Sequence, residues 1–334
     1  MTKLLLRKKL LTMGMIMFAI VLMTACQQNE ETSTTNETEA DSQGEETADE
    51  IAFIDSMDRE VVLEGHPEKI VVLAPEFLKM IYDLDGEAVA RMTTSSIPIP
   101  EAAEDLPELG TVNQINTEEL VGFSPDFVIG APNFHADLEG IMENSDIPFA
   151  LLQMRSFDDV KEMAALMGQI LGKEELADQK IQETEEQMKA VQDQLPSDAN
   201  PSVVILNVTS QSVSVQRANT TAIEIGDLLH VNNIGKDMEA SPDSQSSAPY
   251  SLETIVEEQP DYILLTIHGS VEAGKGKIEE ELESNPAWNS LKAVQDGNVH
   301  IIPSEKYLSN PGFDYADTMQ HMAEIVYPEV FTNE

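Results

Sequence analysis

One histidine stands where its side chain can reach a bound metal. The apolar run 262–267 ends in His268-Gly269. If this run is a buried strand, the imidazole lies beyond its carboxyl end, where open α/β sheets bind their ligands. A neutral imidazole is a good ligand for iron. A single histidine at a strand end is more often structural, so its chemistry depends on the residues around it.

Most other reactive patterns are missing from the sequence. It has no glycine-rich phosphate loop, no Gly-x-Ser-x-Gly elbow and no cysteine besides Cys26, so we expect no catalytic activity. A site for free Zn²⁺ or Mn²⁺ would need three or four His and carboxylate ligands that converge. The six histidines are scattered along the chain instead, and capture of a bare ion is not predicted.

Two glutamates occupy equivalent places in an internal repeat. The segment 116–129, NTEELVGFSPDFVI, is echoed by 251–264, SLETIVEEQPDYIL, which places Glu118 and Glu253 in matching positions. The first residue of each copy, Asn or Ser, can cap a short helix whose first turn favours a carboxylate. Proline ends the helix, and the following apolar run suits a strand covered on both faces. Two such copies predict two similar α/β lobes.

Further strands and one long helix complete this plan. Apolar runs predict strands at 69–73, 149–152, 202–206 and 299–302, and the helical patterns between them predict parallel sheets. Residues 174–195 contain no Gly or Pro and predict a helix of about 22 residues and about 33 Å. A single stiff helix between the lobes implies that their hinge motion is small.

The first 25 residues are typical of a lipoprotein signal peptide. Four basic residues precede an apolar stretch that ends in Leu22-Met23-Thr24-Ala25-Cys26. This stretch is shorter than the roughly 20 residues of a membrane span. We expect Cys26 to carry acyl chains such as palmitate, which anchor the protein on the outer face of the cell membrane. Residues 26–50 are polar and acidic and predict a disordered tether.

The charge of the chain excludes two classes of partner. The formal charge is −42, and removal of the four basic residues of the signal leaves about −46, which argues against binding to nucleic acid or anionic lipid. Contact with the membrane is therefore expected through the lipid anchor only. Beyond the tether we expect a first lobe at 51–173, the connecting helix at 174–196 and a second lobe at 197–334.

From about Ile51 onward the chain resembles the substrate-binding proteins of ABC importers for iron complexes. The resemblance is carried by segments at 58–61, 67–71, 109–110, 225–229 and 286–299 and by the two repeat units, in this order behind the lipobox. It implies an α/β fold of two Rossmann-like lobes with central parallel sheets joined by one long α-helix, the class III periplasmic-binding-protein fold. It also implies that Glu118 and Glu253 dock onto arginines of a permease dimer driven by a cytoplasmic ATPase.

Within this class the second half most resembles the haem receptors of Gram-positive bacteria. Their corresponding His-Gly pair ligates haem iron, which implies the same role for His268. Those receptors carry a methionine where this chain has Asn113, so the second axial ligand is open. Met154, Tyr250 and His135 are the protein alternatives, and water or five-coordinate iron would also serve.

The arginines are compatible with haem and also with alternative ligands. Arg155 and Arg217 can neutralise haem propionates, and together with Arg91 they can grip an anionic ferric siderophore, because a guanidinium offers fixed bidentate donors. Cobalamin is a weaker rival, since the chain has one Trp and few aromatic residues to pack a corrin. Outside this class, a surface adhesin or structural lipoprotein would bind no such ligand.

Overall fold

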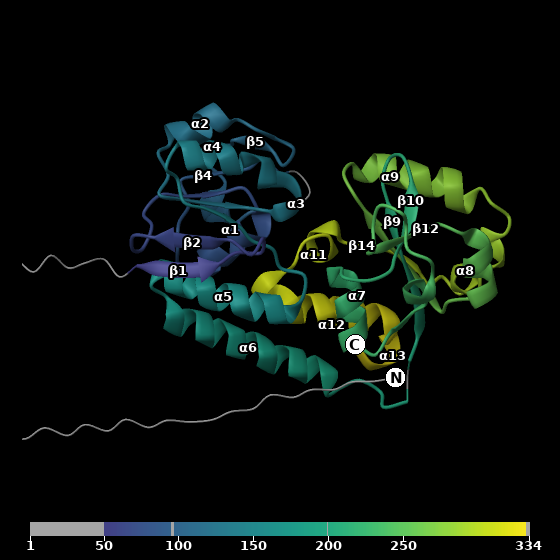
Figure 1. Ribbon diagram of the computed structural model, residues 1–334. Coiled ribbons are helices and arrows are strands. Elements are labelled where there is room, and N and C mark those ends of the chain that lie inside the picture. Colours follow the sequence, from purple (N-terminus) through teal and green to yellow (C-terminus); the bar gives the residue numbers. More distant parts are fainter. Residues whose placement is uncertain (1–49, 95–96, 199, 332–334) are drawn as a thin grey trace, which may run out of the picture. The chain divides into compact units, whose positions relative to one another are not determined.

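A parallel sheet of four strands forms the centre of the first lobe (Figure 1). The computed structural model describes residues 50–94, 97–198 and 200–331, so the predictions for the signal, Cys26 and the tether lie outside the described residues. The strand order is β4-β3-β7-β8, and every pair in it is parallel, as predicted. The elements of this lobe are β1 (Ile51–Ile54), β2 (Glu60–Leu63), β3 (Ile70–Val72), α1 (Pro75–Asp83), β4 (Ala90–Arg91), β5 (Gly110–Thr111), β6 (Gln114–Ile115), α2 (Thr117–Gly122), β7 (Phe127–Gly130), α3 (Pro132–His135), α4 (Glu139–Asn144), β8 (Phe149–Leu151) and α5 (Phe157–Leu171).

The second lobe contains a mixed sheet, where the sequence predicts a parallel one. The pairs β11–β9, β9–β13 and β13–β14 are parallel, whereas β10 is antiparallel to both of its neighbours, β9 and β12. A turn at 209–212 is too short for a crossover, so the chain returns beside β9 as a hairpin. The elements are β9 (Ser202–Val208), β10 (Val213–Gln216), α7 (Thr221–Leu228), β11 (Asn232–Asn233), β12 (Ser247–Pro249), α8 (Leu252–Glu258), β13 (Tyr262–Ile267), α9 (Val271–Ile278), α10 (Lys292–Gln295), β14 (Val299–Ile302), α11 (Ser304–Tyr307), α12 (Tyr315–Val326) and α13 (Pro328–Phe331).

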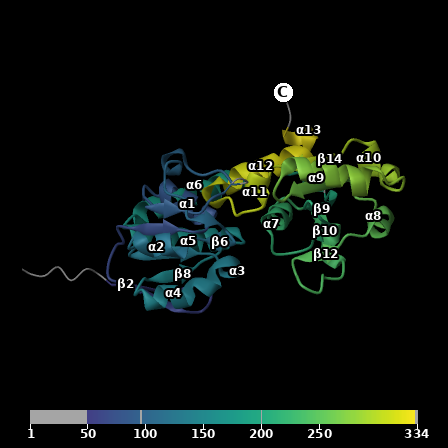
Figure 2. The same cartoon turned by 90° about the horizontal axis from the view of Figure 1, so that it is seen from above.

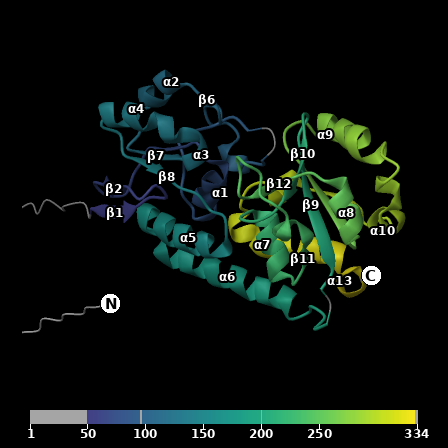
Figure 3. The same cartoon turned by 45° about the vertical axis from the view of Figure 1, so that its right-hand side comes forward.

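A long helix, α6 (Glu174–Gln192), joins the two lobes and ends three residues before the predicted Leu195. Its 19 residues span about 28 Å. It packs against α5 and α12, and Figures 1 and 3 show it running alongside α5. No helix within the described ranges is long and apolar enough to cross a membrane.

One apolar core passes through both lobes. It takes Val72 and Ile129 from the first sheet and Ile205 and Leu264 from the second, with α5, α6, α7 and α12 between them. The remaining face of each sheet has a smaller core of its own, under α2 and α4 in the first lobe and under α8, α9 and α10 in the second (Figure 2). The shared core favours small movements of one lobe against the other, because larger ones would expose buried side chains to water.

Each repeat unit uses its Pro-Asp pair to fix a neighbouring strand. Asn116 and Ser251 cap α2 and α8, as predicted. The carboxylate of Asp126 accepts hydrogen bonds from the backbone N–H groups of residues 68 and 69, at 2.9 and 2.8 Å, just before β3. The carboxylate of Asp261 accepts from the backbone N–H and the hydroxyl of Ser202, at 3.0 and 2.8 Å, where β9 begins. The aspartate thus aligns the start of the strand that runs beside its own.

We expect Asp261→Ala to lower the free energy of unfolding by about 1–3 kcal/mol at neutral pH, because it removes charge-assisted hydrogen bonds. Burial raises the pKa of Asp261, but the hydrogen bonds from Ser202 outweigh it and the net pKa is lowered. The stabilisation is then present above the unfolded pKa of about 3.9 and is lost as pH falls through the lower folded value. Urea unfolding of both proteins at pH 7 and pH 3 measures this difference.

The matched control is Asp243→Ala, which removes the same charge from an exposed position and should change stability by less than about 0.5 kcal/mol. Equal loss of stability in both variants at pH 7 would show that net charge, and not the contact with Ser202, is responsible.

Candidate functional site

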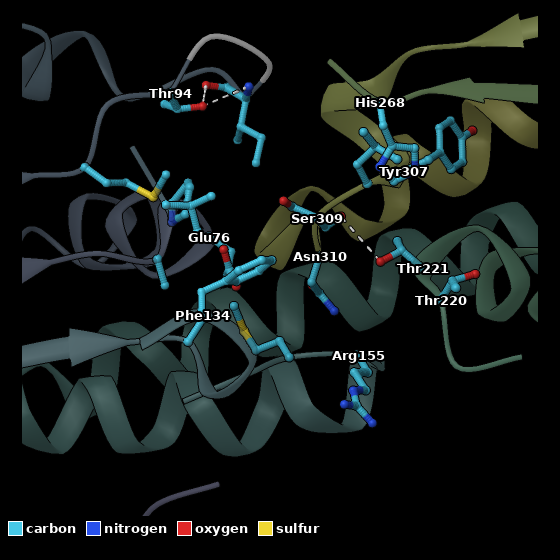
Figure 4. A pocket seen from close by; sticks show the side chains of 18 of the residues that line it. Glu76, Thr94, Phe134, Arg155, Thr220, Thr221, His268, Tyr307, Ser309 and Asn310 are labelled. Carbon is cyan, nitrogen blue, oxygen red and sulfur yellow. Dashed lines mark hydrogen bonds between the residues drawn. The ribbon is translucent and has the colours of Figure 1, made fainter. Parts of the chain in front are cut away.

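A cavity of about 620 Å³ lies between the lobes and takes its walls from both. The first lobe contributes residues that follow its strands and helix starts, at 73–76, 92–94, 97, 111–112, 131, 134 and 154–155. The second lobe contributes 207, 216, 219–221, 268–269 and 307–310. Figure 4 shows Glu76 and Phe134 on one side and His268 and Thr221 on the other. The volume suits a ligand of drug or cofactor size.

The second wall is made by strand ends that change from apolar to polar. On β9, Val203 and Ile205 belong to the shared core, and Asn207 follows on the same face. On β13, Leu264 belongs to that core and His268 lies four residues further on, at the cavity. The strands are parallel and in register, so alternation brings both polar ends to one edge of the sheet.

The structure places His268 in the lining of the cavity. Its side chain is exposed at the cavity wall, and its Nε2 lies 3.2 Å from Oδ1 of Asn207. The surrounding protein desolvates the ring and lowers the pKa of His268, so the neutral imidazole predominates at neutral pH. A neutral imidazole is the form that ligates a metal.

Among the described arginines, only Arg155 lines the cavity. It lies between β8 and α5, and its Nη2 donates to Oε1 of Gln153 at 3.0 Å. Figure 4 shows its guanidinium at the lower edge of the site, apart from His268. Within the described chain it has no ion-pair partner, so it can meet an anionic group of a ligand.

Arg91 and Arg217, which were predicted to contact the ligand, hold loops of the protein instead. The guanidinium of Arg91 is buried, donates to three backbone carbonyl groups in 92–104 and pairs with Glu108 at 2.8 Å. Arg217 donates to the carbonyl oxygens of Met238 and Gln245 at 2.7 and 3.2 Å. Neither lines the cavity, because each guanidinium is used by backbone acceptors that only the folded loops bring near.

Of the alternatives for a second axial ligand, Met154 lines the cavity and Tyr250 and His135 do not. Tyr250 packs on the core of the second lobe, where burial and then Glu281 raise its pKa to about 12. The ring of His135 is buried beside the cavity wall, with Nδ1 accepting from the N–H of Ala131 at 2.9 Å. Burial lowers its pKa, and the nearby carbonyl of residue 112 opposes this. Asn113 does not line the cavity, although its neighbours 111 and 112 do.

Sequence reasoning missed two groups that line the cavity. One is Glu76, half-buried in the first turn of α1, for which the described residues provide no cationic partner. Burial raises the pKa of Glu76, and its own backbone N–H opposes this. The other is the polar set around Asn207 and Gln216. The signal for this set was the alternation of residues 203, 205 and 207, which ends in an amide.

The floor of the cavity is fixed by hydrogen bonds from one lobe to the other. Oε1 of Glu224, on α7, accepts from the N–H of Phe157 at 2.9 Å, and its Oε2 accepts from the hydroxyl of Tyr315. Nδ2 of Asn310 donates to the carbonyl of Ser156 at 3.3 Å. Both contacts hold the start of α5, directly after Met154 and Arg155, so these two side chains keep a defined position relative to the second wall.

Glu118 and Glu253 lie outside the cavity, each in the first turn of its helix. Both are exposed, and neither forms an ion pair with another described residue. In the same part of the chain, no group of three or more His, Cys, Asp or Glu is placed to hold a metal ion.

Comparison with known proteins finds similarity along most of the chain. The family model described as "Periplasmic binding protein" matches residues 70–306. YvrC of Bacillus subtilis, named an uncharacterized ABC transporter substrate-binding lipoprotein, is 23% identical over 84% of this chain and 87% of its own. The Fe(3+)-citrate-binding protein YfmC of the same species is 21% identical over 93% of this chain and 94% of its own.

One solved structure is that of Staphylococcus aureus IsdE complexed with heme. It matches with a TM-score of 0.67 and 17% identity, covering 78% of this chain and 98% of that chain. At this identity the match shows a common fold. Together with the family match it confirms the predicted architecture of two α/β lobes joined by one long helix.

Proposed function

Because the chain belongs to the periplasmic binding protein family, we propose that it captures an iron complex, most favourably haem, in the cavity between its lobes and delivers it to the permease of an ABC importer. Like its relatives, it is a binding protein and not an enzyme. The names of those relatives include binders of Fe(3+)-citrate, of ferric anguibactin and of haem. These names support an iron complex as the ligand. Which iron complex it is must be argued from the residues that line the cavity.

His268 is the observation that carries the haem proposal. It brings a neutral imidazole to the cavity wall, and haem leaves axial positions of its iron for such a ligand. Because the described residues offer no cluster for a bare ion, a ligand that supplies four equatorial nitrogens complements the site. From the first lobe, the buried thioether of Met154 is a candidate for the opposite axial position.

The charges of the cavity also favour haem over highly anionic chelates. Arg155 can pair with a propionate, while Glu76 repels anions when its carboxyl is ionised and has no cationic partner among the described residues. Arg91 and Arg217 are engaged by backbone carbonyl groups. A complex with three or more negative charges would meet one guanidinium and one carboxylate, which together attract it little.

A small ferric chelate such as citrate is the second candidate, and one observation favours it. Polar side chains of Thr93, Thr94, Thr220, Ser309 and Asn310 line the cavity. The three threonine hydroxyls donate to protein acceptors and can accept a hydrogen bond from a hydroxylated ligand, whereas the hydroxyl of Ser309 can donate one. This candidate would use Arg155 as its anion contact. We propose neither cobalamin nor an adhesin, because no specific feature of the cavity favours them.

The remaining parts of the proposal concern the membrane. We infer that the protein works outside the cytoplasm, held by a lipid on Cys26, with residues 27–50 as the tether. A name that includes "lipoprotein" for YvrC supports this inference. We also infer that Glu118 and Glu253 dock with a permease dimer, since matching carboxylates on two similar lobes suit a partner with near two-fold symmetry.

Haemin titration followed by Soret absorbance tests the haem proposal. The purified protein should give a saturable change, and His268→Ala should weaken binding by about 10-fold or more, which corresponds to at least about 1.4 kcal/mol. His300→Ala is the matched control, since this histidine lies on β14 and does not line the cavity. The absence of saturable binding by the unaltered protein would reject haem.

Glu76→Gln tests whether the cavity selects against negative charge. We expect this variant to bind ferric citrate about 5- to 10-fold more tightly than the unaltered protein, a gain of about 1–1.4 kcal/mol from the lost repulsion. Isothermal titration at a pH above the raised pKa of Glu76, where its carboxylate is charged, measures both affinities. Glu87→Gln removes the same charge from an exposed position and should have no effect. Weaker binding by Glu76→Gln would mean that the carboxylate contacts the ligand favourably.

Charge reversal tests the docking inference. The double variant Glu118→Lys/Glu253→Lys should abolish import of the iron complex by cells, because the contacts with permease arginines become repulsive. Its affinity for the ligand in solution should be unchanged. Glu257→Lys, an exposed position on the same helix as Glu253, should transport normally. Normal transport by the double variant would refute the docking role.

A further inference from the structure

A chain of hydrogen bonds in the second wall leads to His268. The hydroxyl of Thr220 donates to Oε1 of Gln216 at 2.6 Å, and Nε2 of Gln216 donates to Oδ1 of Asn207 at 2.7 Å and to Oγ1 of Thr266 at 3.1 Å. The hydroxyl of Thr266 lies 2.6 Å from the same Oδ1 of Asn207. That oxygen is 3.2 Å from Nε2 of His268. Asn207 is therefore the contact through which this network reaches the imidazole.

The network has a definite direction. The Thr220 hydroxyl oxygen accepts the N–H of Ile223 as the cap of α7, so its proton is available to Oε1 of Gln216. Gln216 then presents its NH₂ group to Asn207, and Asn207 must answer with its carbonyl oxygen. An amide oxygen only accepts, so the ring nitrogen that faces it carries the hydrogen. His268 is then protonated at Nε2, and Nδ1 carries the in-plane lone pair that can bind a metal.

Burial makes this arrangement rigid. Gln216 is 2% exposed and Thr266 is fully buried, and strand pairing sets Thr266 directly beside Asn207. A buried amide that lost these partners would leave unpaired polar groups at a high cost. The side chains that hold Asn207 are thus held themselves, by β10, β13 and the start of α7.

We propose that Asn207 is a positioning residue that fixes His268 as the Nε2–H tautomer, so that Nδ1 is the atom offered to a metal complex with one open coordination position. The identity of that metal complex rests on the proposed function, whereas the tautomer does not. A metal-bound imidazole usually donates its second N–H to an oxygen acceptor, which orients the ring. Here the acceptor is in place on the neighbouring strand.

The tautomer is measured by nitrogen NMR of the ¹⁵N-histidine-labelled protein without ligand, at a pH where His268 is neutral. The unaltered protein should show a protonated Nε2 and an unprotonated Nδ1. In Asn207→Leu this preference should be lost, and haemin affinity should fall by about 10- to 100-fold, as for loss of other partners that orient metal ligands. Asn207→Asp keeps an acceptor, so it should retain the Nε2–H tautomer and raise the pKa of His268.

Asn289→Asp is the matched control, because it adds the same charge at an exposed position of the second lobe that does not line the cavity. It should change neither the tautomer nor the haemin affinity by more than about twofold, a difference small on the scale of affinities. An Nδ1–H tautomer in the unaltered protein would overturn the inference, whatever the variants do. So would an Asn207→Leu variant that keeps both the tautomer and the affinity. A protein with the expected tautomer that binds no haemin would reject the haem proposal and leave the positioning role intact.

Discussion

The apolar core shared by the two lobes is the constraint on which the rest of the structure depends. It takes alternate residues from both sheets and joins them through α5, α6, α7 and α12. The two walls of the cavity therefore have a common foundation. Glu224 and Asn310 add polar contacts to the same boundary and fix the start of α5. A ligand meets walls that are already positioned, which lowers the entropy cost of binding.

The polar residues of the cavity follow directly after the strand residues that belong to this core. Alternation along β9 and β13 places apolar side chains under the sheet and then Asn207 and His268 at its edge. Because the strands are parallel and in register, the two polar ends are neighbours without any dedicated loop. The first lobe follows the same principle, since Glu76 and Met154 come shortly after β3 and β8. The site is therefore a product of strand direction.

The sequence predicts the architecture well because its signals are local. Apolar runs, the two capped helices and a stretch without Gly or Pro indicate strands, repeats and α6. His268 and Met154 were predicted near the cleft because they follow such strands, and Arg155 was predicted there as an anion contact. The structure places all three in the lining of the cavity. The prediction of parallel sheets was incomplete, since the direction of β10 depends on the length of one turn.

The misplaced residues share one physical cause. Arg91, Arg217 and Tyr250 lie in or beside irregular segments, and their partners are backbone carbonyl groups or core side chains that are distant in sequence. No local pattern gives the path of such a segment. The network around Asn207 was missed for the same reason, because its members come from β9, β10, β13 and α7 and meet only in the folded chain.

The change from apolar to polar at the strand ends divides each strand into positions that the fold needs and positions that contact the ligand. Val203, Ile205 and Leu264 belong to the core shared by both lobes, and their replacement would destabilise the whole fold. Asn207 lies two residues after Ile205 and His268 four residues after Leu264, and both face the cavity and not the core. During evolution, substitutions at the strand ends can therefore change which ligand is bound while the fold stays the same.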